Sequence, residues 1–392
     1  MSSPRDGLLI SDQSVDIGLG LIGALSDGIG PRPPGSRAEA LACELIEAEL
    51  REYGLEPIVE EFRSSRSFGP SYLALFGLAL VAPFCERRSR WLGGLAGGLA
   101  AGLGIAESRF VLNTPLNVLR RETSRNVWAL IEPSGEAERT VCLVSHMDSS
   151  RSGLMFHPKV TPHLGNAVAA AGAALMVQGL SPVLRCFRPG RLLVRLARVL
   201  IAAGFGLVLE REVRGQDVPG ANDNASGAAA CLCLASHFAQ NPLERTRLVI
   251  LVTGSEESGV FGMREFLASH DTCGWDFVNF DGVGADAPLR VLSKEGGPLS
   301  TLKADPALLE HVRALGEDYP DLRAEPLPDG SGLPYDATPV MEAGGRAISV
   351  VNQDGAIPNY HWPTDTANRI SRPAFKRAVE FGTRLVQRLD GH

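Results

Sequence analysis

Short apolar runs alternate along the chain with longer stretches whose apolar residues recur at helical spacing. The run over residues 248–253 is almost wholly apolar, which is typical of a strand buried on both faces of a sheet. Over residues 36–53, apolar side chains recur every three or four positions and Gly54 follows, which predicts a helix and its end. Runs of the first kind predict strands over residues 57–63, 126–132, 140–146, 248–253, 275–281 and 347–352. Stretches of the second kind predict helices over residues 36–53, 226–239, 258–270, 304–316 and 372–389.

Two stretches rich in uncharged residues interrupt this alternation, over residues 69–108 and 152–218. In each, two apolar segments are joined by a short basic turn, ERRSR in the first and RCFRPGR in the second, which predicts a helical hairpin. We therefore predict an α/β fold with a mixed, mostly parallel central sheet flanked by helices, plus inserted apolar helices. In such sheets, ligands bind at the carboxyl ends of the strands.

The two hairpins raise the question of a membrane. The run over residues 164–184 reaches the length of about 20 apolar residues that a membrane span needs. Arg195 and Arg198 oppose a membrane span over the neighbouring run at residues 192–209, because charges are unfavourable in lipid unless they face protein or reach its surface. We expect membrane association through residues 69–108 and 152–218; the alternative is a soluble cytoplasmic protein in which they form an apolar cap. Arginines flank both ends of the hairpins, so the side of the membrane is undecided.

Charge and cysteine content exclude several classes of protein. With a formal net charge of −7, the protein lacks the positive electrostatic potential that nucleic-acid binding needs. The seven cysteines form no CxxC pair, so neither a disulfide framework nor a structural zinc knuckle is expected. The N-terminal segment has no continuous apolar run, and no signal peptide is predicted. The sequence leaves the oligomeric state open.

Acidic and imidazole side chains stand at predicted strand ends or in tight turns. Asp223 lies in a turn just before a predicted helix, and this turn alone favours a helix cap over an ion ligand. An α/β sheet gathers its strand ends at one edge, however, and gathered carboxylates repel one another unless a cation compensates them. Two imidazoles with several carboxylates suit zinc. The side chains concerned are His146, Asp148, Asp223, Glu256, Glu257, Asp281 and His361.

Five segments resemble, in the same order, the motifs of the family-28 zinc metallopeptidases. They are HMD (146–148), GANDNASG (220–227), TGSEESGVFG (253–262), NFDGVG (279–284) and YHWPTDT (360–366). This family includes di-zinc aminopeptidases and related glutaminyl cyclases. The resemblance implies a fold of the zinc exopeptidase type and one catalytic domain, into which residues 69–108 and 152–218 are inserted. That domain would comprise residues 1–68, 109–151 and 219–392.

The resemblance also implies two zinc ions per chain and a set of ligands for them. Asp223 would bridge the two ions. His361 and Glu257 would complete one metal site, and His146 and Asp281 would complete the other.

The remaining acidic residues of the motifs have implied roles in catalysis. Glu256 would be the general base for a water bridging the metals, and Asp148 would fix the orientation of His146. Asp365 is a candidate for orienting His361, and Asp336 is expected to be structural.

The predicted activity is that of an aminopeptidase, a zinc-dependent exopeptidase that hydrolyses N-terminal residues from peptides with a free N-terminus. The alternatives are a glutaminyl-cyclase-like acyltransferase and a non-catalytic membrane scaffold with the same fold.

Overall fold

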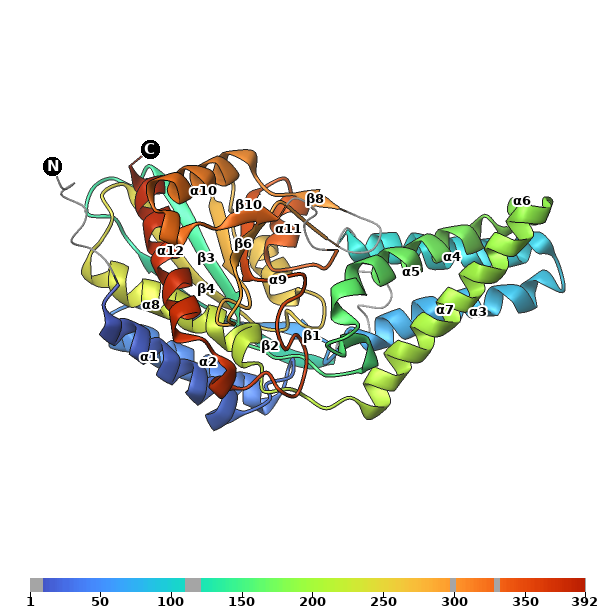
Figure 1. Cartoon of the computed structure of the whole chain (residues 1–392), viewed down its shortest axis with the longest axis horizontal. Coiled ribbons are helices and arrows are strands. Elements are labelled where there is room, and N and C mark those ends of the chain that lie inside the picture. Colours follow the sequence, from blue (N-terminus) through green and yellow to red (C-terminus); the bar gives the residue numbers. More distant parts are fainter. Residues whose placement is uncertain (1–9, 110–120, 297–300, 328–331, 392) are drawn as a thin grey trace.

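An eight-stranded sheet forms the centre of the protein body in the computed structural model, which describes residues 10–109, 121–296, 301–327 and 332–391 (Figure 1). The strand order is β1-β2-β4-β3-β5-β10-β6-β9. Strands β4, β3, β5 and β10 run parallel at the centre, whereas β2 and β6 are antiparallel to their inner neighbours. The sheet comprises β1 (Ile58–Ser64), β2 (Glu122–Ile131), β3 (Arg139–His146), β4 (Thr246–Thr253), β5 (Asp276–Phe280), β6 (Leu289–Leu292), β9 (Glu325–Leu327) and β10 (Arg346–Asn352). This confirms the predicted mixed, mostly parallel sheet; β7 (Lys294–Glu295) and β8 (Leu302–Lys303) form a separate ribbon.

Helices cover both faces of the sheet. On one face, α8 (Gly227–Gln240) packs on β3, β4 and β5, and α1 (Asp12–Gly23), α2 (Arg37–Glu52) and α12 (Arg372–Asp390) surround it. On the other face lie α9 (Phe261–Ser269) and α11 (Ala337–Glu342), while α10 (Pro306–Asp318) packs on α12 and β10. The apolar residues of β4 are buried on both sides, as the continuous apolar run requires.

Helix α1 has no counterpart among the predicted helices. Three glycines in its sequence lower its intrinsic helical propensity. A Cβ atom at Gly18 would lie 2.7 Å from the Phe375 ring and from the Cys233 sulfur. The glycine therefore lets α1 approach α8 and α12 closely, and this tertiary packing stabilises a helix that propensity alone does not predict.

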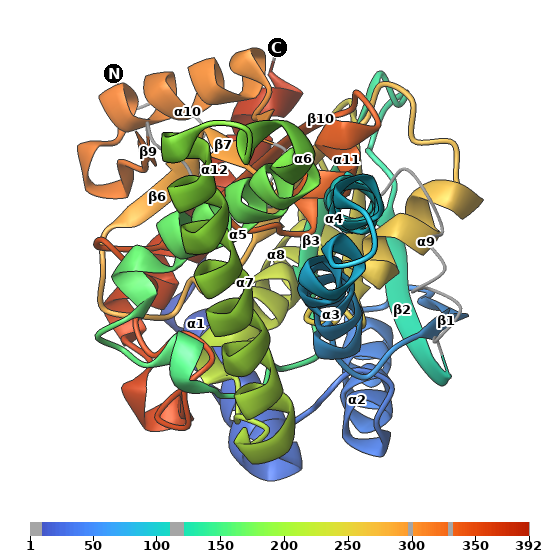
Figure 2. The same cartoon turned by 90° about the vertical axis from the view of Figure 1, so that its right-hand side faces the viewer.

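Five helices form an apolar arm, defined here as α3 (Gly69–Glu86), α4 (Arg90–Ser108), α5 (Leu164–Gly179), α6 (Ser181–Leu184) and α7 (Arg188–Arg214). Figure 1 shows the arm projecting from the body, with α6 at its far end, and Figure 2 shows the arm end-on in front of the body. The arm has a hydrophobic core of its own, which includes Phe76, Leu175 and Ile201 and is separate from the main core. The predicted run over residues 164–184 is not one helix, because α5 ends at Gly179 and a short turn of helix follows.

Candidate metal centre

The loops that follow the parallel strands bring the predicted site residues together. His146 is the last residue of β3, Asp281 follows β5, and Glu256 and Glu257 lie shortly after β4. Asp223 precedes α8, and His361 lies in the loop after β10. Because β3, β4, β5 and β10 are parallel, these loops emerge at one edge of the sheet.

The buried side chains form two clusters that share Asp223. In the first, His146 Nε2 lies 3.4 Å from Asp223 Oδ1 and 3.5 Å from Asp281 Oδ2. In the second, His361 Nε2 lies 3.1 Å from Asp223 Oδ2 and 3.0 Å from Glu257 Oε1. Each cluster supplies three ligand atoms within 4.8 Å of one another. The two oxygens of one carboxylate therefore face two separate imidazoles.

Unpartnered polar atoms in the second cluster test whether a cation fits there. Asp223 Oδ2 and Glu257 Oε1 are buried, yet neither accepts a hydrogen bond from any described residue. Both point at His361 Nε2 from about 3 Å without hydrogen-bond geometry. Buried carboxylate oxygens without a partner are unfavourable unless a cation compensates them. Imidazole and carboxylate ligands in this number fit zinc.

Asp148 connects His146 to the loop that carries the two glutamates. Its two carboxylate oxygens accept the backbone N–H groups of Glu256 at 3.1 Å and Glu257 at 3.0 Å. The same carboxylate lies 3.4 Å from His146 Nδ1, the ring nitrogen that faces away from Asp223. Asp148 is therefore placed to hold the imidazole and the Glu256–Glu257 backbone in one arrangement.

The prediction that Asp365 orients His361 is wrong. Its carboxylate accepts the backbone N–H groups of Asn222 at 2.8 Å and Asp223 at 3.0 Å, so it fixes the turn before α8. His361 Nδ1 has no hydrogen-bond partner among the described residues. The His361 ring is instead held by Phe156, which lies edge-on at 4.4 Å between ring centroids.

The first helical turn of α8 shows why Asp223 is not a helix cap. The side chain of Asn224 accepts the N–H groups of Gly227 at 3.0 Å and Gly282 at 3.1 Å. Asn224 is therefore the capping residue, although the sequence of the turn favours Asp223 for that role. The Asp223 carboxylate remains directed at the two imidazoles.

Arg32 is a buried residue of the site that sequence reasoning missed. Its guanidinium donates to the backbone carbonyls of Met147 and Gly220, and also to those of Leu25, Gly30 and Pro219. Burial lowers the pKa of Arg32 to about 10, although the charge on Asp148 opposes that shift. Arg32 thus joins the loop after β3 to the turn that carries Asp223.

Replacing Arg32 with methionine is expected to lower the free energy of unfolding by about 3 kcal/mol or more, because several buried carbonyls would lose their donor. Urea unfolding followed by circular dichroism measures this loss. The matched Arg37→Met variant removes an exposed arginine from α2 and should change stability by less than about 0.5 kcal/mol. Equal stabilities of the two variants would contradict this structural role.

The electrostatics of the cluster favour charged imidazoles and a protonated Glu256 carboxyl when no metal is present. Burial lowers the pKa of His361, but Glu257 and Asp223 outweigh it and raise that pKa to about 9. Burial raises the pKa of Asp281 to about 6, against the opposing effect of His146. Burial also raises the pKa of Glu256 well above its ordinary value; His146 opposes this and Glu257 adds to it. A cation in the cluster would replace these protons as the compensating charge.

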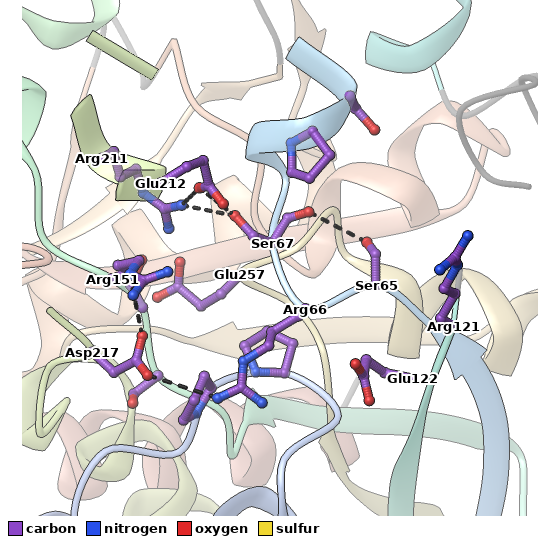
Figure 3. Close-up of a pocket in the computed structure, with 16 residues that line it drawn as sticks. Ser65, Arg66, Ser67, Arg121, Glu122, Arg151, Arg211, Glu212, Asp217 and Glu257 are labelled. Atoms are coloured by element: carbon purple, nitrogen blue, oxygen red, sulfur yellow. Dashed lines mark hydrogen bonds and ion pairs between the residues drawn. The ribbon is translucent and has the colours of Figure 1, made fainter. Parts of the chain in front are cut away.

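A pocket of about 250 Å³ opens onto Glu257 where the arm joins the body (Figure 3). Ser67 and Arg211, from the junctions of α3 and α7, line it, as do Arg151 and Asp217 from the loops beside α7. Arg151 Nε lies 3.5 Å from Asp217 Oδ1, and Arg211 donates to Ser67 at 2.8 Å. The pocket wall therefore carries several charged and hydroxyl side chains and is built partly from the inserted segments.

Comparison with known protein families indicates a class for this site. Residues 207–385 match the model of peptidase family M28, and this match contains Asp223, Glu256, Glu257, Asp281 and His361. This part of the chain is therefore similar to peptidase family M28. A comparison with curated proteins found no significant match.

Solved structures share the fold of this chain over almost its whole length. The zinc aminopeptidase BSAP from Bacillus subtilis has a TM-score of 0.57 and 16% identity, with 97% of this chain and 95% of that chain covered. A Zn-dependent exopeptidase from Parabacteroides distasonis has a TM-score of 0.56 and 13% identity, covering 97% and 99%. The Fimbriiglobus ruber glutaminyl cyclase has a TM-score of 0.56 and 14% identity, covering 99% of both chains.

The family match over residues 207–385 supports a peptidase, and the solved structures show the fold. They do not separate an aminopeptidase from a glutaminyl cyclase, because structures of both kinds have this fold.

Proposed function

We propose that this protein is an aminopeptidase that uses two zinc ions to remove N-terminal residues from peptides. The observation that supports this most directly is the sharing of Asp223 between two clusters of three ligand atoms, with Glu256 beside them. Asp223 would bridge the ions, His146 and Asp281 would complete one site, and Glu257 and His361 would complete the other. When bound, the two ions supply Lewis acidity and a nucleophile at neutral pH.

Glu256 is proposed as the general base. It is half-buried, next in sequence to Glu257, and its backbone N–H is fixed by Asp148. A carboxylate atom of Glu256 lies within 4.8 Å of ligand atoms of His146 and Glu257. Its carboxylate would accept the proton of the attacking water and return it to the leaving amine.

The pocket beside Glu257 supports action at the end of a peptide. Its volume of about 250 Å³ is below the range of about 300–1,000 Å³ that drug-sized ligands occupy. A pocket of this size suits one substrate residue, and the bound cations or a nearby carboxylate would select a free amino group.

A panel of aminoacyl reporter substrates tests the proposed function. We expect about two zinc ions per purified chain, release of the reporter from free aminoacyl substrates, and no release from their N-acetylated forms. Removal of zinc by a chelator should abolish turnover, and added zinc should restore it. Equal hydrolysis of free and N-acetylated substrates would argue against an aminopeptidase.

A glutaminyl cyclase is the second candidate, because the fold is shared with the Fimbriiglobus ruber glutaminyl cyclase. Peptides that begin with glutamine separate the two activities. An aminopeptidase releases free glutamine, whereas a cyclase releases ammonia and leaves the peptide chain intact. A purified chain without zinc and without either product would favour the non-catalytic scaffold.

A further inference from the structure

The outer surface of the apolar arm is unusual because it is both apolar and uncovered. Most of the large exposed apolar side chains among the described residues lie on the arm rather than on the body. Leu95 on α4 is 69% exposed and Val199 on α7 is 66% exposed, and the exposed set extends over every helix of the arm. Representative members are Val81, Phe84, Leu92, Leu95, Met176, Val183, Leu196, Val199 and Val213. Single apolar residues on a surface are ordinary, but a contiguous apolar surface of this extent marks an interaction site.

The arm has the length and composition of a membrane-spanning unit. Within the described residues, Gly69–Glu86 and Arg188–Arg214 are long and apolar enough to cross a bilayer. At 1.5 Å per residue they measure about 27 and 40 Å, against a hydrocarbon core of about 30 Å. Only 28% and 22% of these apolar windows are buried, so neither helix resembles the core helix of a soluble protein.

Polar groups of the arm lie in its interior or near one of its two ends. The buried Glu86 carboxylate binds Arg185 and Arg198, and the Ser181 hydroxyl donates to it at 3.2 Å. Arg198 also donates to Gln178 at 3.0 Å, so its charge is satisfied inside the bundle. Such internal pairing is how charged residues are accommodated at membrane depth.

The far end of the arm combines arginines with aromatic residues. Phe84, Trp91 and Phe187 are each at least 60% exposed there. Arg195 is exposed two helical turns from the start of α7, within reach of that end for a long side chain. Aromatic rings favour the boundary between lipid and water, and arginines bind anionic headgroups. The basic residues in the two turns are Arg87, Arg88, Arg90, Arg185, Arg188 and Arg191.

We propose that the apolar arm spans a lipid bilayer as one helical bundle of α3, α4, α5 and α7. The turns at residues 86–90 and 185–191 then lie in the far headgroup layer. The body, including the metal centre, then lies wholly on the opposite side, because each hairpin leaves the body and returns to it. A second copy of the chain would cover one side of the bundle, whereas apolar residues are exposed on α3, α4, α5 and α7 alike. Lipid covers all sides at once. This proposal does not depend on the proposed peptidase activity.

Two natural cysteines test the topology. Cys186 is exposed at the far end of the arm and Cys273 is exposed on the body, and both are free thiols. In sealed membrane vesicles from cells that produce the full chain, Cys85→Ala/Cys273→Ser leaves Cys186 as the accessible thiol. Cys85→Ala/Cys186→Ser leaves Cys273. A membrane-impermeant maleimide should label one of these variants in right-side-out vesicles and the other in inverted vesicles, and both after detergent is added.

Labelling of both thiols from the same side, or recovery of the protein in the soluble fraction, would overturn the proposal. Arg88→Cys, in the other turn of the arm, repeats the test if Cys186 does not react in detergent. A second experiment uses charge: Leu95→Glu/Val199→Glu should shift most of the protein out of the membrane fraction. The matched variant Ile17→Glu, at an exposed apolar position of the body, should leave the distribution unchanged.

Discussion

Glu256→Gln is expected to lower kcat by about 10²–10⁴-fold while zinc content stays that of the unaltered protein. Glutamine has the shape of glutamate but cannot accept the proton of an attacking water. The residue is not in either cluster that shares Asp223, so its replacement leaves both sets of proposed ligands intact. Steady-state kinetics on an aminoacyl reporter and elemental analysis of the same preparation provide the two measurements.

The control for this substitution is Glu52→Gln, which makes the same change at an exposed position at the end of α2. We expect it to have normal turnover and zinc content. If the Glu256→Gln enzyme had a turnover close to that of the Glu52→Gln control, Glu256 would not be the general base. Loss of zinc together with turnover would instead indicate that Glu256 is a ligand.

Asp223→Ala is expected to abolish measurable hydrolysis and to lower the zinc content of the chain. Asp223 is the one residue common to the two clusters that are centred on His146 and His361, so its loss removes a ligand from both. Zinc per chain should fall from about two toward zero in elemental analysis after gel filtration. Unchanged zinc content would contradict the bridging role.

The controls for this variant separate metal loss from misfolding. Asp223→Asn keeps the shape of the side chain and its backbone contacts with Asp365, but the neutral amide is a weaker ligand. We expect this variant to remain folded by circular dichroism and to bind zinc less tightly. Asp286→Ala, at an exposed aspartate after β5, should resemble the unaltered protein in both measurements.

Much of the candidate site could be predicted because its acidic and imidazole residues follow recognisable apolar strands. The continuous apolar runs of β3, β4 and β5 are enough to place His146, Glu256, Glu257 and Asp281 at one edge of the sheet. Once the strands are taken as parallel, the position of the site at their carboxyl ends follows from the fold class. The helices that cover the faces of the sheet are harder to predict. Helix α1, for example, is stabilised by its packing on other helices and not by its own sequence propensity.

The supporting residues were missed because their contacts are distant in sequence. Ser36 and Glu39 have the spacing of a capping box, and Ser36 does cap α2 by accepting the Glu39 N–H. The Glu39 carboxylate, however, accepts the N–H of Ser255 at 2.8 Å, more than two hundred residues away. The Glu39 carboxylate thereby holds Ser255, the residue before Glu256, in a backbone conformation with a positive φ of 55°. No local pattern distinguishes such a contact from an ordinary cap.

The junction between body and arm has a kinetic consequence. The pocket beside Glu257 is lined by residues 65–67 and 70–71 at the start of α3 and by Arg211 and Glu212 at the end of α7. An arm embedded in lipid would hold the mouth of that pocket against the headgroups. Encounters with an amphiphilic substrate would then occur by diffusion in two dimensions, and diluting that substrate with inert lipid would slow turnover at constant bulk concentration.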